Sequence, residues 1–232
     1  MKKYNTLLFD SDDTLLDFKK AETKALCSAM NECSLPFSKE LCETYSKANK
    51  VYWKAFENGE IEKKEIYVGR FELFLKNADI NFPAAELAAK YEALLKKQYD
   101  KIEGAELTCK ALKDKYNMYI VSNGNVFVQL SRLEGSGLKA YFKDVFVSEK
   151  VGCPKPQKEF FDFVFSSIGT TDKSKVLIIG DSISSDICGG INAGIDTCLF
   201  LREPNNSGVN PTYTVKNHKE LRELLLECEE IL

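Results

Sequence analysis

The sequence predicts an α/β protein whose core is a doubly wound parallel sheet, with a helical domain inserted into it. Two observations indicate this fold. Short apolar runs rich in Ile, Val, Leu and Phe show little alternation with polar residues, as in parallel strands buried on both faces. In the second half of the chain, these runs alternate with helical patterns of crossover length. The predicted strands are Thr6–Phe9, Met118–Val121, Val145–Val147, Val176–Ile179 and Thr197–Leu201.

Helices are predicted on both sides of the later strands. Three patterns have the length of a crossover helix, namely Val126–Gly135, Lys158–Ile168 and Ile183–Ala193. A fourth pattern, Lys219–Leu232, is amphipathic and predicts a final helix that covers the sheet.

The long segment between the first two strands reads mostly as helix. Turn residues divide it into four predicted helices, Asp17–Cys33, Ser38–Phe56, Glu62–Asn77 and Ala84–Tyr99. Ser38 is a suitable N-cap for the second of them. Since four helices joined by short loops form a small bundle, we expect a four-helix cap domain of residues 16–100, inserted into a core domain of residues 1–15 and 101–232.

The composition excludes some classes of partner. The 232 residues have a formal net charge of −3 and no basic run, so a nucleic-acid polymer is not an expected partner. The apolar run after Met1 ends at Asp10, and no segment has transmembrane length, so no membrane association is expected. The eight cysteines have irregular spacing without a Cys-x-x-Cys pair, which is typical of reduced thiols in a cytoplasmic protein. A monomer or a dimer is expected.

The single histidine, His218, lies in a polar stretch that predicts a surface position. A Ser-His-Asp triad or a His-rich zinc site is therefore not expected. If the protein is a hydrolase, its carboxylates are expected to transfer the protons.

Polar and charged residues follow four of the predicted strands. These segments are Asp10-Ser11-Asp12-Asp13-Thr14, Ser122-Asn123-Gly124, Cys153-Pro154-Lys155-Pro156 and Gly180–Asp186. Ligand sites of open α/β sheets lie beyond the carboxyl ends of the strands, so we expect the four segments to meet there. Carboxylates crowded at that edge need a counter-charge, from a metal ion, a substrate cation or a structural ion pair.

Each of these segments alone also has a purely structural interpretation. Asp12 and Asp13 could cap the next helix, and Ser122-Asn123-Gly124 could form a turn. Lys155 could be a solvated surface residue, and Asp181 could lie at an N-cap. Four such segments at one edge of the sheet favour a catalytic site.

Taken together, Asp10-x-Asp12-x-Thr14, Ser122, Lys155 and Gly180-Asp181-x-x-x-x-Asp186 resemble the four motifs of the haloacid dehalogenase superfamily. They occur in the order of that family, and the predicted helical cap has the position of its first (C1) cap class. The resemblance covers nearly the whole chain and implies a Rossmann-like α/β core.

The resemblance also implies a role for each acid. Asp10 would be the nucleophile that forms an aspartyl-phosphate, and Asp12 would be the general acid and then the general base. Mg²⁺ would be held by the Asp10 carboxylate, the main-chain carbonyl of Asp12 and Asp181. Asp186 would anchor this metal site from behind or through water.

Three further residues are implied to bind the phosphoryl oxygens. Ser122, the amide of Asn123 and Lys155 would neutralise the charge that spreads over these oxygens in the transition state.

Substrate choice is expected to depend on the cap. Candidate contacts there are Phe18, Trp53 and Arg70, although Trp53 shares a helical face with Tyr52 and Phe56 that also suits the bundle core. An aromatic wall opposite the phosphate would suit a planar base.

A narrower resemblance, to pyrimidine 5′-nucleotidases of the YjjG type, implies a nucleoside monophosphate such as UMP, dUMP or dTMP as substrate. It is carried by Asn49–Lys54, Gly69–Glu72, Ser122-Asn123-Gly124 and Gly189–Gly194.

Other functions remain as alternatives. A phosphotransferase or mutase, or a sugar-phosphate phosphatase of the same superfamily, would use the same nucleophile. Dehalogenases resembling the founding members do not pair the nucleophile with an acid two residues on, so Asp12 favours phosphoryl transfer. A non-catalytic binding protein is disfavoured, because it has no physical need for so many uncompensated charges.

Overall fold

A computed structural model of the chain describes residues 4–201 and 208–226. The chain divides into two compact units, one formed by Lys19–Gln98 and the other by the segments on either side of it. This division lies within a few residues of the domain boundaries that the sequence predicts, residues 16 and 100.

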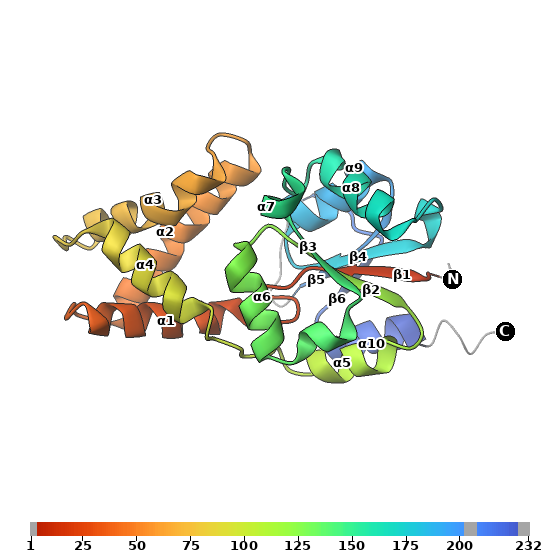
Figure 1. Cartoon of the computed structure of the whole chain (residues 1–232), viewed down its shortest axis with the longest axis horizontal. Helices are drawn as coiled ribbons and strands as arrows, with labels where there is room; N and C mark the ends of the chain where they lie inside the picture. The colour runs from red at the N-terminus through yellow and green to blue at the C-terminus, as the bar shows by residue number, and fades with distance from the viewer. Residues whose placement is uncertain (1–3, 202–207, 227–232) are drawn as a thin grey trace. The chain divides into compact units, whose positions relative to one another are not determined.

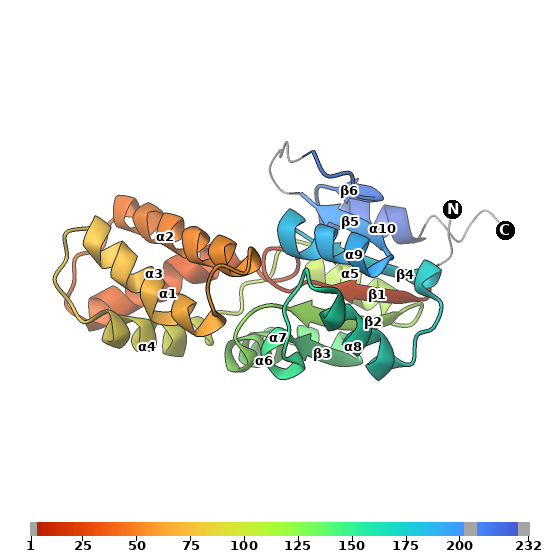
Figure 2. The ribbon, with the colours of Figure 1, turned by 90° about the horizontal axis from the view of Figure 1, so that it is seen from above.

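The larger unit contains a six-stranded parallel sheet with the strand order β3-β2-β1-β4-β5-β6 (Figure 2). The strands are β1 (Thr6–Phe9), β2 (Asn117–Ser122), β3 (Asp144–Val147), β4 (Val176–Gly180), β5 (Asp196–Phe200) and β6 (Tyr213–Val215). The predicted α/β class with a parallel sheet is thus confirmed. The edge strand β6 was not predicted, because Tyr213-Thr214-Val215 is not a continuous apolar run.

Helices cover both faces of this sheet, which explains why its strands lack alternation. Figure 1 shows α8 (Lys158–Ile168) and α9 (Cys188–Ala193) on one side, and α5 (Ala105–Leu112) and α10 (His218–Leu226) on the other. In β1, Leu7 and Phe9 pack with α5 and α10, whereas Leu8 packs with α8 and α9. The helix α6 (Val126–Gly135) adds Leu133 to the cluster of Leu7.

The predicted helix over Ile183–Ala193 is divided in two. A π-helical turn, η3 (Ile183–Ile187), precedes α9. The wider turn forms because the main-chain N–H groups of Asp186 and Ile187 both donate to the carbonyl of Ser182, at 2.9 and 3.1 Å. A π-helical turn within a helical segment often marks a functional site, and this one carries Asp186.

The remaining helices of this unit are short or differ at their ends from the prediction. Helix α5 and the four-residue helix α7 (Ser148–Val151) were not predicted. Helix α10 begins at His218, and the part of its predicted span beyond Leu226 lies outside the described residues.

The smaller unit consists of four helices, α1 (Phe18–Glu32), α2 (Lys39–Glu57), α3 (Lys63–Asn77) and α4 (Ala84–Leu95), of which α1 begins at the boundary residue. Ser38 is the N-cap of α2, and its hydroxyl accepts a hydrogen bond from Leu41 N at 3.2 Å, as predicted. The interior is aromatic, with Tyr45 in ring contact with Phe71 and Tyr91. Among the described residues, no helix of either unit is long and apolar enough to cross a bilayer.

The prediction of a surface position for His218 is wrong. Its side chain is 1% exposed and lies against the ring of Phe200, with the ring centroids 4.8 Å apart. Its Nε2–H donates to the carbonyl oxygen of Thr14 at 2.8 Å, so the imidazole anchors the loop that follows Asp10. Burial lowers the pKa of His218 to about 4; the hydrogen bond to Thr14 opposes this effect only in part, and the charge of Arg222 lowers the pKa slightly further.

This depressed pKa makes the stability of the protein depend on pH. Above pH 6.5, His218 is neutral in both the folded and the unfolded chain and contributes no pH dependence. Between pH 6.5 and pH 4, only the unfolded chain takes up the proton, so the free energy of unfolding falls by up to about 3 kcal/mol. We expect urea denaturation to show that the stability advantage of the wild type over a His218→Gln variant shrinks across this range. A pH-independent difference would show that the pKa of His218 is the same in the folded and the unfolded chain.

Candidate active site

The register of the three central strands brings the polar segments to one level. Phe9 in β1 pairs with Ile120 in β2 and with Ile179 in β4. Asp10 therefore leaves the sheet beside the ends of both neighbouring strands, and its main-chain N–H donates to the carbonyl of Ile179 at 2.8 Å.

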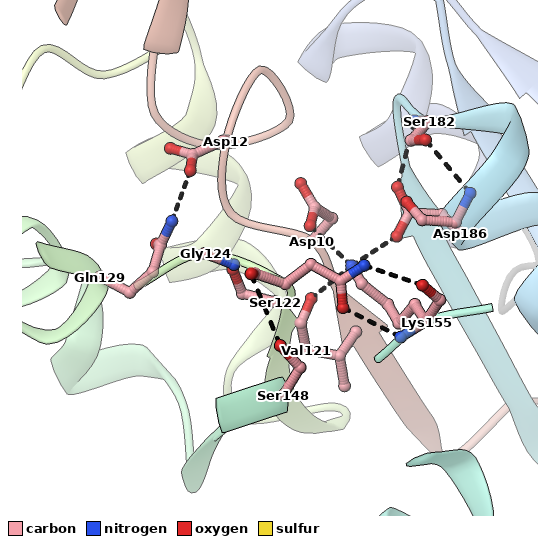
Figure 3. A network of polar contacts seen from close by, with 12 residues as sticks. Asp10, Asp12, Val121, Ser122, Gly124, Gln129, Ser148, Lys155, Ser182 and Asp186 are labelled. Carbon is pink, nitrogen blue, oxygen red and sulfur yellow. Dashed lines mark hydrogen bonds and ion pairs between the residues drawn. The ribbon is translucent and has the colours of Figure 1, made fainter. Parts of the chain in front are cut away.

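Lys155 joins the ends of these strands (Figure 3). Its side chain is almost fully buried, and Nζ donates to Asp10 Oδ1 at 2.8 Å, to Asp186 Oδ1 at 2.6 Å and to the carbonyl of Val121 at 2.7 Å. The three oxygens use the three N–H groups of an ammonium ion. Burial alone would lower the pKa of Lys155, but Asp10 and Asp186 hold this pKa above its ordinary value, so the side chain is charged.

Asn123 places Lys155 in this position. The Asn123 side chain donates from Nδ2 to the Lys155 carbonyl at 2.8 Å and accepts from Lys155 N at 2.9 Å. Because both ends of this side-chain amide are occupied by the Lys155 backbone, a phosphate contact by Asn123 would use its main-chain N–H, and this contact stays a prediction. Ser122, the neighbouring predicted phosphate ligand, is buried at the end of β2 and accepts a hydrogen bond from Gly124 N at 3.0 Å.

Three carboxylates lie together beside Lys155. One oxygen from each of Asp10, Asp181 and Asp186 can be chosen so that all lie within 4.8 Å of one another. Asp186 is fully buried and accepts a further hydrogen bond from Ser182 N at 3.1 Å. The approach of Asp186 requires a glycine at position 180, since a Cβ there would lie 2.2 Å from Asp186 Oδ2.

The charge of this cluster fits a bound cation. Burial raises the pKa of Asp10, and Lys155 only partly opposes this effect. Burial, followed by the charges of Asp10 and Asp186, also raises the pKa of Asp181. One ammonium group thus does not balance three carboxylates, whose hard oxygen atoms are the donors that Mg²⁺ prefers.

Asp12 has a separate environment from that of Asp10. Its side chain is turned toward α6, where Oδ2 accepts a hydrogen bond from Gln129 Nε2 (Figure 3). Oδ1 forms an ion pair with Arg132 Nη1. Sequence reasoning missed Gln129 and Arg132. The sequence did contain a sign of them, because these two polar residues share the otherwise buried helix face of Val126 and Leu133.

Asp13 has the capping position that the sequence predicts for it. Its Oδ1 accepts a hydrogen bond from Phe18 N, at the start of α1, at 3.1 Å. The residue has φ = 54°, a left-handed conformation that Asp and Asn tolerate better than most residues.

The cap candidates lie in different surroundings. The ring of Phe18 lies against the guanidinium group of Arg132, with 5.6 Å from Cζ to the ring centroid. Trp53 is half-buried and in edge-to-face contact with Phe56. Arg70 is 4% exposed inside the helical unit, where Nη1 donates to Asn49 Oδ1 at 2.9 Å. A substrate contact by Phe18, Trp53 or Arg70 stays a prediction, and for Arg70 the buried hydrogen bond already gives it a structural role.

Known proteins share both the sequence and the fold of this chain. HAD-hydrolase YfnB of Bacillus subtilis is 40% identical over 97% of this chain and 97% of its own length. A crystal structure of YfnB bound to magnesium, which reveals interdomain movement, matches with a TM-score of 0.91 at 39% identity, over 97% of this chain and 99% of YfnB.

Two pyrimidine 5′-nucleotidases are similar over nearly their whole length. PynA of Streptococcus pneumoniae is 35% identical, over 96% of this chain and 95% of PynA. YjjG of Escherichia coli is 33% identical, over 96% of this chain and 98% of YjjG. Residues 7–200 match the family of haloacid dehalogenase-like hydrolases. The resemblance that the four sequence motifs indicate is thereby confirmed, and the chain belongs to the haloacid dehalogenase-like hydrolase family.

Proposed function

We propose that this chain is a magnesium-dependent phosphomonoesterase that acts through an aspartyl-phosphate on Asp10. The observation that supports this most is the separation of two acids of one loop into two environments. Asp10 contacts Lys155 in the acidic cluster, whereas Asp12 contacts Arg132 and Gln129 on α6. Two carboxylates with different surroundings can take different roles in one reaction.

The roles follow from these surroundings. A carboxylate oxygen of Asp10 attacks phosphorus, the bond from phosphorus to the ester oxygen breaks, and Asp12 gives that oxygen a proton. Asp12 then takes a proton from water as the water attacks phosphorus, which releases phosphate and restores Asp10. The charge of Lys155, buried beside Asp10, stabilises the negative charge of the transferred group together with Ser122 and the main chain at Asn123.

The acidic cluster is where a magnesium ion would be held. Asp10, Asp181 and the main-chain carbonyl of Asp12 are the proposed ligands, and Asp186 holds the site from behind through Lys155 and Ser182. When bound, the ion supplies positive charge that neutralises a phosphoryl oxygen.

The proposed substrate is a pyrimidine nucleoside 5′-monophosphate. This proposal is supported by PynA and YjjG, whose similarity extends over the helical unit as well as the core. Displacement of a halide is disfavoured, because a departing halide needs no proton and leaves Asp12 without a role. The cytoplasmic location and a monomeric or dimeric state stay predictions.

Phosphate release from a panel of esters tests this function. With Mg²⁺ present, we expect UMP, dUMP and dTMP to give a higher kcat/KM than purine nucleotides and sugar phosphates. EDTA should abolish release, and excess Mg²⁺ should restore it, since the uncompensated charge at Asp10 and Asp181 requires a cation. An Asp181→Asn variant should lose the response to Mg²⁺, whereas Asp114→Asn, at an exposed position, should keep it.

Three outcomes would contradict parts of the proposal. Faster turnover of sugar phosphates than of every nucleotide would overturn the substrate class. Full activity in EDTA would overturn the role of the metal ion. Consumption of an ester without free phosphate would indicate transfer to a second substrate.

A further inference from the structure

Two buried residues of α6 hold both carboxylate oxygens of Asp12. Arg132 and Gln129 are 0% and 1% exposed and lie one helical turn apart, so both point to the same side of α6. Arg132 Nη1 pairs with Oδ1, and Gln129 Nε2 donates to Oδ2. The Asp12 side chain itself stays 28% exposed. Contacts to both oxygens fix the plane of the carboxyl group, while part of it remains open to an approaching molecule.

The surroundings keep these two donors in place. The ring of Phe18 covers the Arg132 guanidinium group. Gln129 lies so close to Gly124 that a Cβ at position 124 would come within 2.4 Å of Gln129 Nε2. The start of α6 is fixed as well, because Asn125 Oδ1 accepts hydrogen bonds from Phe127 N and Val128 N, at 3.0 and 3.1 Å.

A fully buried arginine on a helix face is costly unless a charged partner compensates it. Arg132 forms an ion pair with Asp12, a partly exposed acid in the loop that also contains the proposed nucleophile. A leucine at position 132 would fill the interior of this helix face without that cost. Packing alone therefore does not account for an arginine at this position.

We infer that Arg132 is a positioning residue for the proton transfer by Asp12, with Gln129 as its second support. This inference rests on the proposed phosphomonoesterase function and adds two residues to it. A free aspartate side chain rotates among several rotamers, whereas the contacts to α6 restrict Asp12 to one of them. General acid catalysis needs the acid within hydrogen-bond reach of the leaving oxygen, so this restriction contributes directly to the rate.

A comparison of kcat/KM for two substrates with different leaving groups distinguishes a positioning role of Arg132 from a purely structural one. The alkoxide that leaves from UMP requires a proton, but the nitrophenolate that leaves from p-nitrophenyl phosphate does not. We expect Arg132→Met to lower kcat/KM for UMP by about 10- to 100-fold, and for p-nitrophenyl phosphate by less than about 3-fold. Asp12→Ala should show the same selectivity for the substrate with the better leaving group. In the double variant, loss of Arg132 should add little to the loss of Asp12.

Matched variants keep the test informative. Arg222→Met removes another arginine of the core, one that donates to Gly104 O and Thr108 Oγ1 and does not contact Asp12, so it should leave the selectivity unchanged. Arg132→Lys should restore part of the activity toward UMP. If Arg132→Met does not fold, Gln129→Met provides the same comparison, with a smaller expected loss.

The outcomes distinguish this inference from the function on which it rests. An equal loss for both substrates, no loss at all, or additive losses in the double variant would overturn the positioning role alone. If the wild type hydrolyses another ester but not UMP, that ester replaces UMP in the comparison. If the wild type hydrolyses no phosphomonoester, the proposed function fails, and the positioning role fails with it.

Discussion

Replacing Asp10 with asparagine is expected to lower kcat for phosphate release by at least about a thousandfold. An amide is a far weaker nucleophile than a carboxylate, so the aspartyl-phosphate does not form. Phosphate release from UMP measures the loss directly. Denatured, acid-quenched wild-type enzyme should retain phosphate on the protein, and the variant should not.

The same variant is expected to keep its fold. Burial and the neighbouring acids raise the pKa of Asp10, so neutralising this side chain relieves repulsion in the cluster with Asp181 and Asp186. Its melting temperature should therefore equal or exceed that of the wild type. Asp114→Asn is the matched control and should keep full activity. Near-normal turnover by Asp10→Asn would exclude Asp10 as the nucleophile.

Replacing Lys155 with alanine is expected to lower both activity and stability. The change leaves Asp10 and Asp186 without the ammonium group that each contacts, and it leaves the carbonyl of Val121 without this donor. Breaking a buried ion pair by removing one partner costs about 3–5 kcal/mol. Urea denaturation measures the loss of stability, and phosphate release measures the loss of activity.

A methionine at position 155 separates the charge from the volume of this side chain. The Lys155→Met side chain fills most of the volume of the lysine but carries no charge. If the charge of Lys155 contributes more to stability than its volume, the free energy of unfolding of Lys155→Met should lie only slightly above that of Lys155→Ala. A methionine variant with the stability of the wild type would show that Lys155 acts through packing.

Much of this fold was predictable because its signals are local. The five predicted strands all occur in the sheet, and burial on both faces accounts for their continuous apolar runs. The structure brings Asp10, Asp181 and Asp186 together because parallel strands end at a common edge. That rule needs only the order of the strands and the residues that follow them.

Two contacts that the sequence did not predict are long-range. The polar neighbours of His218 in the sequence indicate a surface position, yet folding buries this side chain against Thr14. Thr14 lies near the other end of the chain, so the sequence around His218 gives no sign of this contact. Arg132 likewise reads as one charged residue in an amphipathic helix, until folding brings Asp12 against it. No local periodicity encodes such pairs. The polar side chain within an apolar stripe was the one local sign, and it does not identify the partner.

The three oxygens that surround Lys155 Nζ come from parts of the chain that are made at very different times. The carboxylate of Asp10 is synthesised first, the carbonyl of Val121 follows more than a hundred residues later, and Asp186 comes later still. During synthesis, Asp10 therefore spends most of the time without the ammonium group of Lys155 and without Asp186. The cluster of Asp10, Asp181 and Asp186 can therefore form only after β4 and the turn that follows it have been synthesised, and a chain that ends before Asp181 lacks two of its three acids.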